Sequence, residues 1–263
     1  MIRDVQAIDV HAHLGAYTTQ DATYQQFMSG DAARVAALAE RAHTAITVVS
    51  GLRAFFPEGA YDILAGNEDA RQAAEREPRL RVWAVFDPRV PAVIRQVEAL
   101  LTHPACVGIK IHPELHEYPI TDYGRAIFGF AARHRAVVQT HSGQERTMPL
   151  DYLPFADAFP EVTLLLSHNG FCWNGDLTQQ VRAVQRSRHG NVYTDTSSAK
   201  SVIPQLHEWT VREVGADKLL YGTDSPLYFA PMQRARLDAA EMGDAEKQRI
   251  LRGNAERILG LGE

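Results

Sequence analysis

Eight short runs rich in Val, Ile, Leu and Tyr recur along this chain, and each is followed by a stretch with helical character. Strand and helix in strict alternation are typical of a parallel sheet covered by helices, and eight such units close into a (β/α)8 or TIM barrel. A length of 263 residues suits one such barrel. The predicted strands are Ile8–Leu14, Ala45–Ser50, Leu80–Phe86, Cys106–His112, Ala136–His141, Val162–His168, Asn191–Thr196 and Lys218–Asp224.

An open doubly wound sheet is the alternative, but no G-x-G-x-x-G sequence follows an early strand. There is no low-complexity linker or internal repeat, so we expect one domain over residues 1–263. Among the intervening helices, one is expected to begin at Asn67 and another to carry Pro91 in its first turn. Residues 15–30 are expected to form a short insertion after the first strand, and residues 244–261 extra helices outside the barrel.

Composition narrows the range of partners. The net charge is −5, and the densest basic set, Arg182, Arg186 and Arg188, is typical of a solvated helix face, so neither nucleic acid nor a membrane is an expected partner. No apolar run approaches the roughly 18 residues of a membrane span, and the N-terminus does not resemble a signal peptide. With only two cysteines, Cys106 and Cys172, a reducing, cytoplasmic location is expected. We expect a small-molecule substrate as partner and leave a homo-oligomer open.

Histidines gather at the carboxyl ends of the predicted strands. His11 and His13 are one residue apart in the first strand, so both side chains point to the same face and can grip one metal ion. Active sites in this fold are built at the carboxyl ends of the strands. The same rim is predicted to hold four further polar side chains, His112, His141, His168 and Asp224.

In its order of motifs the sequence resembles the amidohydrolase superfamily, in the branch that also contains nonoxidative decarboxylases. The resemblance covers nearly the whole chain, from His11-x-His13 to the end. Its other motifs are Gly108-Ile109-Lys110-Ile111-His112-Pro113, Thr140-His141-Ser142-Gly143, Ser167-His168, Gly222-Thr223-Asp224-Ser225-Pro226 and the segment 253–261.

This resemblance implies that His11, His13, His141 and Asp224 bind one divalent ion, most simply zinc. Three neutral imidazoles and a carboxylate suit Zn²⁺, and an open position on the ion would activate water. By the same resemblance His168 lies beside the metal, where it orients water or polarises the substrate. Asp224 would both ligate the ion and move a proton.

Lys110 has two interpretations. In relatives with two metals, a lysine at the end of the fourth strand is carbamylated and bridges the ions. We favour one metal and a Lys110 ammonium that faces the substrate, since a single metal is the commoner pattern in this branch. A structural pairing of Lys110 with an interior acid such as Asp9 is the remaining alternative.

The loops after the strands mix cationic and aromatic groups, which suits a small anionic or aromatic substrate. Four residues are candidates for substrate binding, namely Arg53, His112, Arg146 and Trp173. The main hypothesis is a metal-dependent hydrolase of an ester, lactone or amide. The alternatives are a metal-dependent nonoxidative decarboxylase of an aromatic or enoic acid, with Asp224 or His168 as the acid, and a metal-binding barrel without turnover.

Overall fold

The computed structural model describes residues 2–262, in which eight parallel strands form one sheet in sequential order. The sheet curls into a barrel because the residues after the last strand return to the first strand. Val10 N donates to Tyr221 O at 2.9 Å, and His13 N donates to Ser225 O at 2.6 Å. The predicted TIM barrel is therefore confirmed. The strands are β1 (Ala7–Leu14), β2 (Thr44–Gly51), β3 (Leu80–Val85), β4 (Cys106–Ile111), β5 (Val137–Thr140), β6 (Leu164–Leu166), β7 (Val192–Asp195) and β8 (Leu219–Leu220).

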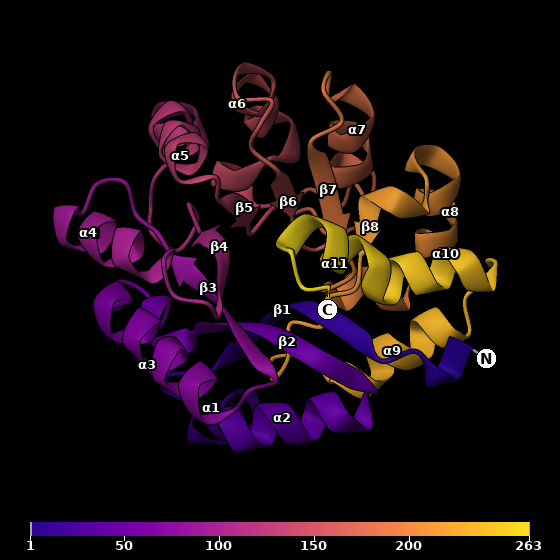
Figure 1. The fold of residues 1–263 in the computed structure, drawn as a ribbon, viewed down its shortest axis with the longest axis horizontal. Helices are drawn as coiled ribbons and strands as arrows, with labels where there is room; N and C mark the ends of the chain where they lie inside the picture. The colour runs from indigo at the N-terminus through magenta and orange to yellow at the C-terminus, as the bar shows by residue number, and fades with distance from the viewer. Residues whose placement is uncertain (1, 263) are drawn as a thin grey trace.

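Helices surround the barrel as an outer ring (Figure 1). Local sequence sets several of their starts: Asp31 caps α2 by accepting from Arg34 N at 2.8 Å, and Pro91 occupies the first turn of α4, as predicted. The ring consists of α2 (Ala32–Arg41), α3 (Ile63–Arg76), α4 (Pro91–Leu100), α5 (Ile120–His134), α6 (Leu153–Ala158), α7 (Gln179–Arg186), α8 (Leu206–Val214) and α9 (Ala230–Asp238).

The predicted start of a helix at Asn67 is wrong. That helix, α3, begins at Ile63 and is capped by Asp62, which accepts from Ala65 N at 2.9 Å. Asn67 lies buried inside it and binds the backbone of Val85 on β3 through both its amide nitrogen and its oxygen. The polar side chain therefore joins a helix to the sheet and does not cap the helix.

The predicted additions to the barrel are present. After β1 the chain forms α1 (Ala22–Met28), and Gly15 and Gly30 pair at the base of this insertion. At the other end of the chain, α10 (Asp244–Gln248), a π-helical turn (Arg249–Gly253) and α11 (Asn254–Leu259) follow. Figure 1 shows α11 across one end of the barrel, and Ala255 packs there with the interior side chains Ile8 and Leu220. One end of the barrel is thus closed by apolar packing.

Short 3-10 segments complete the described chain and mostly follow strands. One of them follows β2 and two follow β5, at the opposite, open end of the barrel. These segments are Ile2–Asp4, Leu52–Ala54, Glu145–Thr147, Pro149–Tyr152, Ala199–Val202 and Ala216–Lys218.

Two strands end at least two residues earlier than predicted. β6 stops at Leu166 and β8 at Leu220, whereas the predicted strands extended to His168 and Asp224. Both of these residues have left-handed backbone conformations, with φ of 70° and 57°. A strand cannot continue through such a residue, and side chains other than glycine adopt this region rarely. The chain therefore does not stay extended through the two predicted site residues.

One close contact fixes α3 against the sheet. A Cβ on Gly51 would lie 2.2 Å from Gly66 O, and a Cβ on Gly66 would lie 2.5 Å from Ala54 N. Two glycines without side chains therefore allow the helix to approach the end of β2 closely. This contact holds Phe55, which follows the second strand, beside the open end of the barrel.

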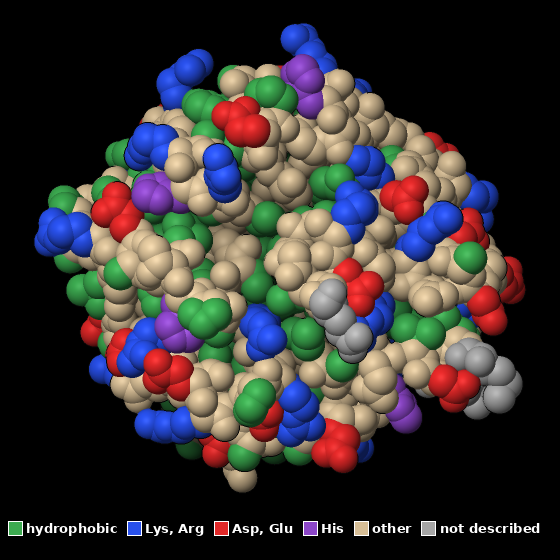
Figure 2. All heavy atoms as spheres, in the orientation of Figure 1, with side chains coloured by type: hydrophobic (Ala, Val, Ile, Leu, Met, Phe, Trp, Pro, Cys, Tyr) green, Lys and Arg blue, Asp and Glu red, His purple; other side chains and the backbone are tan. Residues whose placement is uncertain are grey.

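Among residues 2–262, no helix is long and apolar enough to cross a membrane. The face of the molecule shown in Figure 2 carries acidic and basic side chains interspersed.

Candidate metal centre

A cavity of about 310 Å³ opens at the carboxyl ends of the strands. Its floor is polar and its walls are largely aromatic, as in sites for small ligands. The polar lining includes His11, His13, Lys110, His112, His141, His168 and Asp224. The walls and mouth include Tyr17, Phe55, Phe56, Glu58, Leu115, Gln144, Phe171, Leu227 and Tyr228.

Three of the four predicted metal ligands meet on this floor. Ligand atoms of His11, His13 and Asp224 all lie within 4.8 Å of one another, and all three residues are buried. His13 Nε2 is 3.1 Å and His11 Nε2 3.5 Å from Asp224 Oδ1. The first strand supplies both imidazoles, and the turn after the last strand supplies the carboxylate.

The arrangement of these atoms fits a bound cation. Asp224 Oδ1 is buried and has no hydrogen-bond partner among residues 2–262, although two ring nitrogens are close to it. On the far sides of the rings, His11 Nδ1 lies 2.8 Å from Ser197 Oγ, and His13 Nδ1 lies 3.0 Å from Ser50 Oγ. Outer hydrogen bonds to Nδ1 leave Nε2 for a metal ion. An orphaned carboxylate oxygen between such nitrogens is satisfied by a divalent ion.

Burial keeps the imidazoles in their neutral, ligand-ready form. It lowers the pKa of His11 to about 3, with a further contribution from the nearby charge of Lys110. Burial is also the main reason why the pKa values of His13 and His141 lie well below the usual value for histidine. Neutral imidazole is the form that binds a metal.

His141 lies beside the group of three and not within it. Its ring stacks on His112 at a centroid distance of 4.3 Å, and its Nδ1 is 3.0 Å from His168 Nε2. Its Nε2 is buried and unpartnered in the described part of the chain. Contacts with His112 and His168 thus hold the His141 ring next to the group of three, with its Nε2 free of other partners in the described chain.

Lys110 is 1% exposed, on the floor of the cavity. Its Nζ lies 2.5 Å from His11 Nε2 and 5.9 Å from the centre of the Phe55 ring. Burial lowers the pKa of Lys110 to about 8, against the opposing charges of Asp224, Asp195 and Asp9. The lysine therefore faces the cavity and the histidines.

Asp9 was considered from the sequence as an ion-pair partner of Lys110, but its hydrogen bonds go to other residues. Its carboxylate accepts from Thr223 Oγ1 at 2.5 Å, from Thr223 N at 3.0 Å and from His11 N at 3.0 Å. Burial raises the pKa of Asp9 to about 7, although the bonds from Thr223 and His11 act against that shift. Asp9 thus joins the first strand to the turn that carries Asp224.

His112, the predicted substrate-binding residue that lines the cavity, has a defined proton position. Its Nδ1 accepts from Leu115 N at 3.2 Å. Burial lowers the pKa of His112 well below the usual value, so the ring is neutral. A neutral ring that accepts at Nδ1 carries its proton on Nε2. His112 is therefore a hydrogen-bond donor.

The other three predicted substrate-binding residues lie elsewhere. Arg53 is 58% exposed and faces Asp69 at 3.8 Å, and Arg146 pairs with Glu114 at 3.0 Å. Trp173 is 61% exposed. The described residues that line the cavity do not include these three. Their role in substrate binding stays a prediction, and no contact in the structure supports it.

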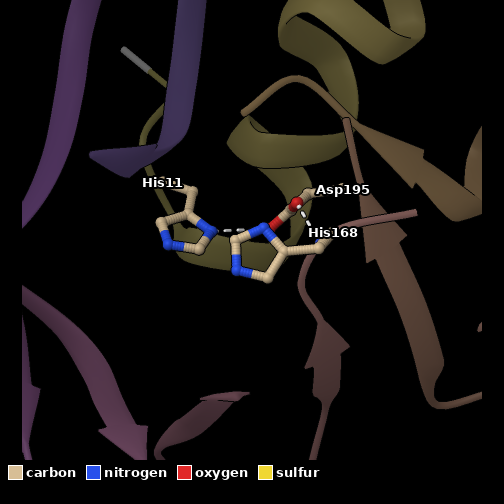
Figure 3. A group of neighbouring side chains, drawn as sticks. All are labelled: His11, His168 and Asp195. Carbon is tan, nitrogen blue, oxygen red and sulfur yellow. Dashed lines mark hydrogen bonds and ion pairs between the residues drawn. The ribbon is translucent and has the colours of Figure 1, made fainter. Parts of the chain in front are cut away.

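Two buried residues of the site are missing from the sequence-based set. Asp195 ends β7, and its Oδ2 lies 3.3 Å from His11 Nδ1 (Figure 3). Ser197 follows two residues later and contacts both His11 and His168. The sequence Thr194-Asp195-Thr196-Ser197 holds the clue, because it is a polar run at the end of a strand. A prediction based on histidines does not reach this strand, because β7 contains none.

Burial alone would raise the pKa of Asp195. Its hydrogen bond with His11, the proximity of His11 and His168 and the hydrogen bond from Ser197 together hold this pKa below its usual value. Asp195 is therefore an ionised carboxylate inside the protein, and it can only accept hydrogen bonds.

A sequence model of the family described as amidohydrolase matches residues 8–261 of the chain. The chain belongs to the amidohydrolase family. The resemblance seen in the sequence motifs is confirmed. No curated protein matches the sequence.

Solved structures of similar fold include several decarboxylases. The 5-carboxyvanillate decarboxylase of Sphingomonas paucimobilis has 14% identity and a TM-score of 0.73, with 98% of this chain and 99% of that chain covered. The 2,6-dihydroxybenzoate decarboxylase of Rhizobium has 14% identity and a TM-score of 0.73, with coverages of 97% and 99%. A dihydroxybenzoic acid decarboxylase of Polaromonas, solved with bound manganese, has 14% identity, a TM-score of 0.73 and 98% coverage of both chains. At this identity the likeness concerns the fold.

Proposed function

We propose that this amidohydrolase-family enzyme is a metal-dependent nonoxidative decarboxylase of a small aromatic or enoic acid. The observation that carries the proposal is one cavity with aromatic walls that also contains the buried ammonium of Lys110, the hydrogen-bond donor His112 and the carboxylate of Asp224. The similar solved structures that act on dihydroxybenzoate and carboxyvanillate support it. This was the alternative to hydrolysis in the sequence-based reasoning, and it now becomes the preferred function.

We propose that His11, His13 and Asp224 hold one divalent ion, with His141 as the fourth ligand through its unpartnered Nε2. When bound, the ion would stabilise negative charge that develops on substrate oxygens. Three imidazoles and a carboxylate suit Zn²⁺, whereas the Polaromonas decarboxylase was solved with manganese. Both ions therefore belong in the test.

Two donors on the floor would bind the substrate carboxylate or a neighbouring phenol oxygen. Lys110 offers an ammonium group, and His112 offers its Nε2–H. Phe55 and Phe171 both belong to this lining and would pack against a planar ring. A substrate carboxylate held by Lys110 is the role first proposed for this lysine, without a carbamate or a second ion.

Asp224 is the proposed proton donor. Its Oδ1 faces the imidazoles, so the transferable proton is placed on Oδ2. The bond between the substrate carbon and its carboxylate breaks, CO2 leaves, and the electron pair left on that carbon takes the proton. Asp224 then regains a proton from solvent.

Hydrolysis is the second candidate, because the matching family is described as amidohydrolase. In that reaction Asp224 would accept a proton from the attacking water and pass it to the leaving group. Lys110 and His112 would polarise the carbonyl oxygen of an ester, lactone or amide. The same residues serve both reactions, so the products must decide between them.

The test measures products with protein that has been stripped of metal and reloaded with Mn²⁺ or with Zn²⁺. Hydroxybenzoates and enoic acids form one panel, and lactones and esters form the other. CO2 release, with deuterium at the vacated carbon when the reaction runs in D2O, supports the proposal. Acid release from the second panel at constant pH establishes the hydrolase. Ligand binding without any turnover identifies a non-catalytic barrel.

Two variants give this assay its contrast. Asp224→Asn removes the proton donor and should abolish CO2 release while the fold is retained. Asp31→Asn changes a surface N-cap into another good N-cap and should leave turnover unchanged. Equal turnover by wild type and Asp224→Asn would contradict the role of Asp224.

A further inference from the structure

We propose that Asp195 and Ser197 fix the proton positions on His11 and His168 and, through His168, on His141. This inference rests on the metal-dependent function proposed above, because it explains how two of the ligands present a lone pair to the ion. It makes Asp195 and Ser197 positioning residues. It also assigns His168 to the support of His141, and not to proton transfer with the substrate.

The first step is the position of the Ser197 hydroxyl. Ligand atoms of His11, His168 and Asp195 are close enough together to hold an ion of their own. Ser197 Oγ, however, lies 2.8 Å from His11 Nδ1 and 3.0 Å from His168 Nδ1, and it makes a short hydrogen bond with Asp195 Oδ1. The hydroxyl fills the space among the three side chains, so this group is a centre of hydrogen bonding and not a second ion site.

The second step fixes the proton on His11. Asp195 Oδ1 accepts from the backbone N–H groups of His168 and Ser197, so it is an acceptor and the Ser197 hydroxyl donates its hydrogen to it. The Ser197 oxygen is then left as an acceptor. Among the described residues, His11 Nδ1 has the Ser197 oxygen at 2.8 Å and Asp195 Oδ2 at 3.3 Å as its hydrogen-bond partners, so Nδ1 must carry the proton. His11 Nε2 therefore presents its lone pair to the cavity.

The third step reaches His141 by way of a backbone carbonyl. His168 Nδ1 lies 3.0 Å from Ser197 O, and a carbonyl cannot donate, so Nδ1 carries the proton. In the neutral ring His168 Nε2 is then an acceptor. His141 Nδ1, 3.0 Å away, must donate to it. This leaves the lone pair of His141 on Nε2, the buried atom without a partner among the described residues.

The backbone adds an independent observation. His168 is held with φ of 70°, and its own N–H donates to Asp195 Oδ1 at 3.0 Å. Ser197 N donates to the same oxygen at 3.0 Å. One carboxylate thus anchors the unusual backbone of His168 and the hydroxyl that contacts its ring. Strained residues of this kind persist only where the surroundings impose them.

The experiment reads proton positions directly, in metal-stripped protein labelled with ¹⁵N-histidine. Two-bond ¹H–¹⁵N correlation spectra should show His11, His141 and His168 with the proton on Nδ1. In Asp195→Asn the amide can donate to His11 Nδ1, so the His11 proton should move to Nε2. Mn²⁺ affinity, measured by competition with a chelator, should then fall by about 10–100-fold.

Matched variants distinguish the loss of a histidine's hydrogen-bond partner from a general loss of stability. Thr194→Val removes another buried hydroxyl of β7, one that donates to Leu166 O and contacts no imidazole, and should leave the Mn²⁺ affinity unchanged. His168→Gln keeps an acceptor for His141 Nδ1 and should bind Mn²⁺ within about tenfold of wild type, whereas His168→Leu should lose about 10–100-fold.

Two results would overturn the inference. One is a wild-type spectrum with the His141 proton on Nε2, and the other is wild-type Mn²⁺ affinity in both Asp195→Asn and His168→Leu. A failure of the proposed metal site would look different, because the wild type itself would then bind no divalent ion, and a failure of the proposed decarboxylation would appear only in the product assay. The proton positions would still be measured in that case and would still decide the inference.

Discussion

At the scale of single residues, the site is built from groups that the fold holds in states they would not adopt in water. His11 stays neutral because burial lowers its pKa to about 3, and burial brings the pKa of Lys110 to about 8. His168 and Asp224 have left-handed backbone conformations. Perturbed groups gathered in one cavity are typical of functional sites.

Removal of one proposed ligand tests the metal site. His13→Ala deletes the nitrogen that lies 3.1 Å from Asp224 Oδ1. Metal affinity should fall by more than the roughly 10–100-fold that follows loss of an outer hydrogen-bond partner. Elemental analysis after dialysis measures the bound ion, and exposed His189 gives the control variant His189→Ala. Full metal content in His13→Ala would contradict the ligand assignment.

Substitution of Lys110 separates substrate binding from chemistry. Lys110→Met keeps most of the side-chain volume and removes the buried charge. KM for a carboxylate substrate should rise by about tenfold or more, since a charged hydrogen bond is worth roughly 1.5–3 kcal/mol. The free energy of unfolding should not decrease, because a buried ammonium is costly. An unchanged KM would argue against a Lys110 that faces the substrate.

At the scale of elements, the strands were the most predictable part of the chain. All eight were found from composition alone, since β-branched and aliphatic runs between helical stretches are distinctive. The ends of β6 and β8 were not predicted correctly, because the left-handed conformations of His168 and Asp224 depend on tertiary hydrogen bonds. The start of α3 was misplaced for a related reason, since Asn67 resembles a cap in sequence but binds the sheet.

The contact between α3 and β2 gives a prediction at this scale. Gly66→Ala would place a Cβ 2.7 Å from the Cβ of Ala54 and should lower the free energy of unfolding by about 1–3 kcal/mol. Gly129→Ala, in α5, would meet nothing closer than Phe159 Cζ at 3.8 Å and should raise stability by up to about 1 kcal/mol. Urea denaturation measures both. Equal effects of the two substitutions would contradict the close approach.

At the scale of the whole molecule, the barrel explains which site residues could be predicted. A rule that polar residues at the carboxyl ends of strands face one cavity found His11, His13, His112, His141, His168 and Asp224, whereas Lys110 was predicted from the family resemblance. Applied to every strand, it would also have found Asp195. The loop residues Arg53, Arg146 and Trp173 were beyond such a rule, because loop conformation follows from contacts distant in sequence.

Acid should destabilise the molecule through histidines buried in neutral form. Burial lowers the pKa of His207 to about 3, and neither ring nitrogen has a partner in residues 2–262. The unfolded chain takes up this proton near pH 6.5, so stability is full above that pH. It is lost toward pH 3 at about 1.4 kcal/mol per pH unit. His207→Leu should therefore exceed the wild type in stability by a margin that grows as the pH falls.

Urea denaturation of metal-stripped protein at pH 7.5, 6 and 5 measures this margin, with exposed His189→Leu as the control. Asp9 acts in the opposite direction. Its pKa of about 7 in the folded state contributes stability that is lost as the pH rises from 3.8 through 7. Asp9 is common to both proteins, so it does not affect the comparison. Parallel pH profiles of wild type and His207→Leu would contradict the prediction.

The barrel is closed by hydrogen bonds between β1 and the turn after β8, and these bonds also bring Asp224 to His11. A nascent chain therefore has no complete metal site until residues beyond Ser225 have left the ribosome. Until then the imidazoles of β1 have neither their carboxylate partner nor the neighbours that align them. Under the proposed ligand set, binding of the ion is therefore coupled to closure of the barrel, because neither β1 nor the turn after β8 alone carries all the ligands.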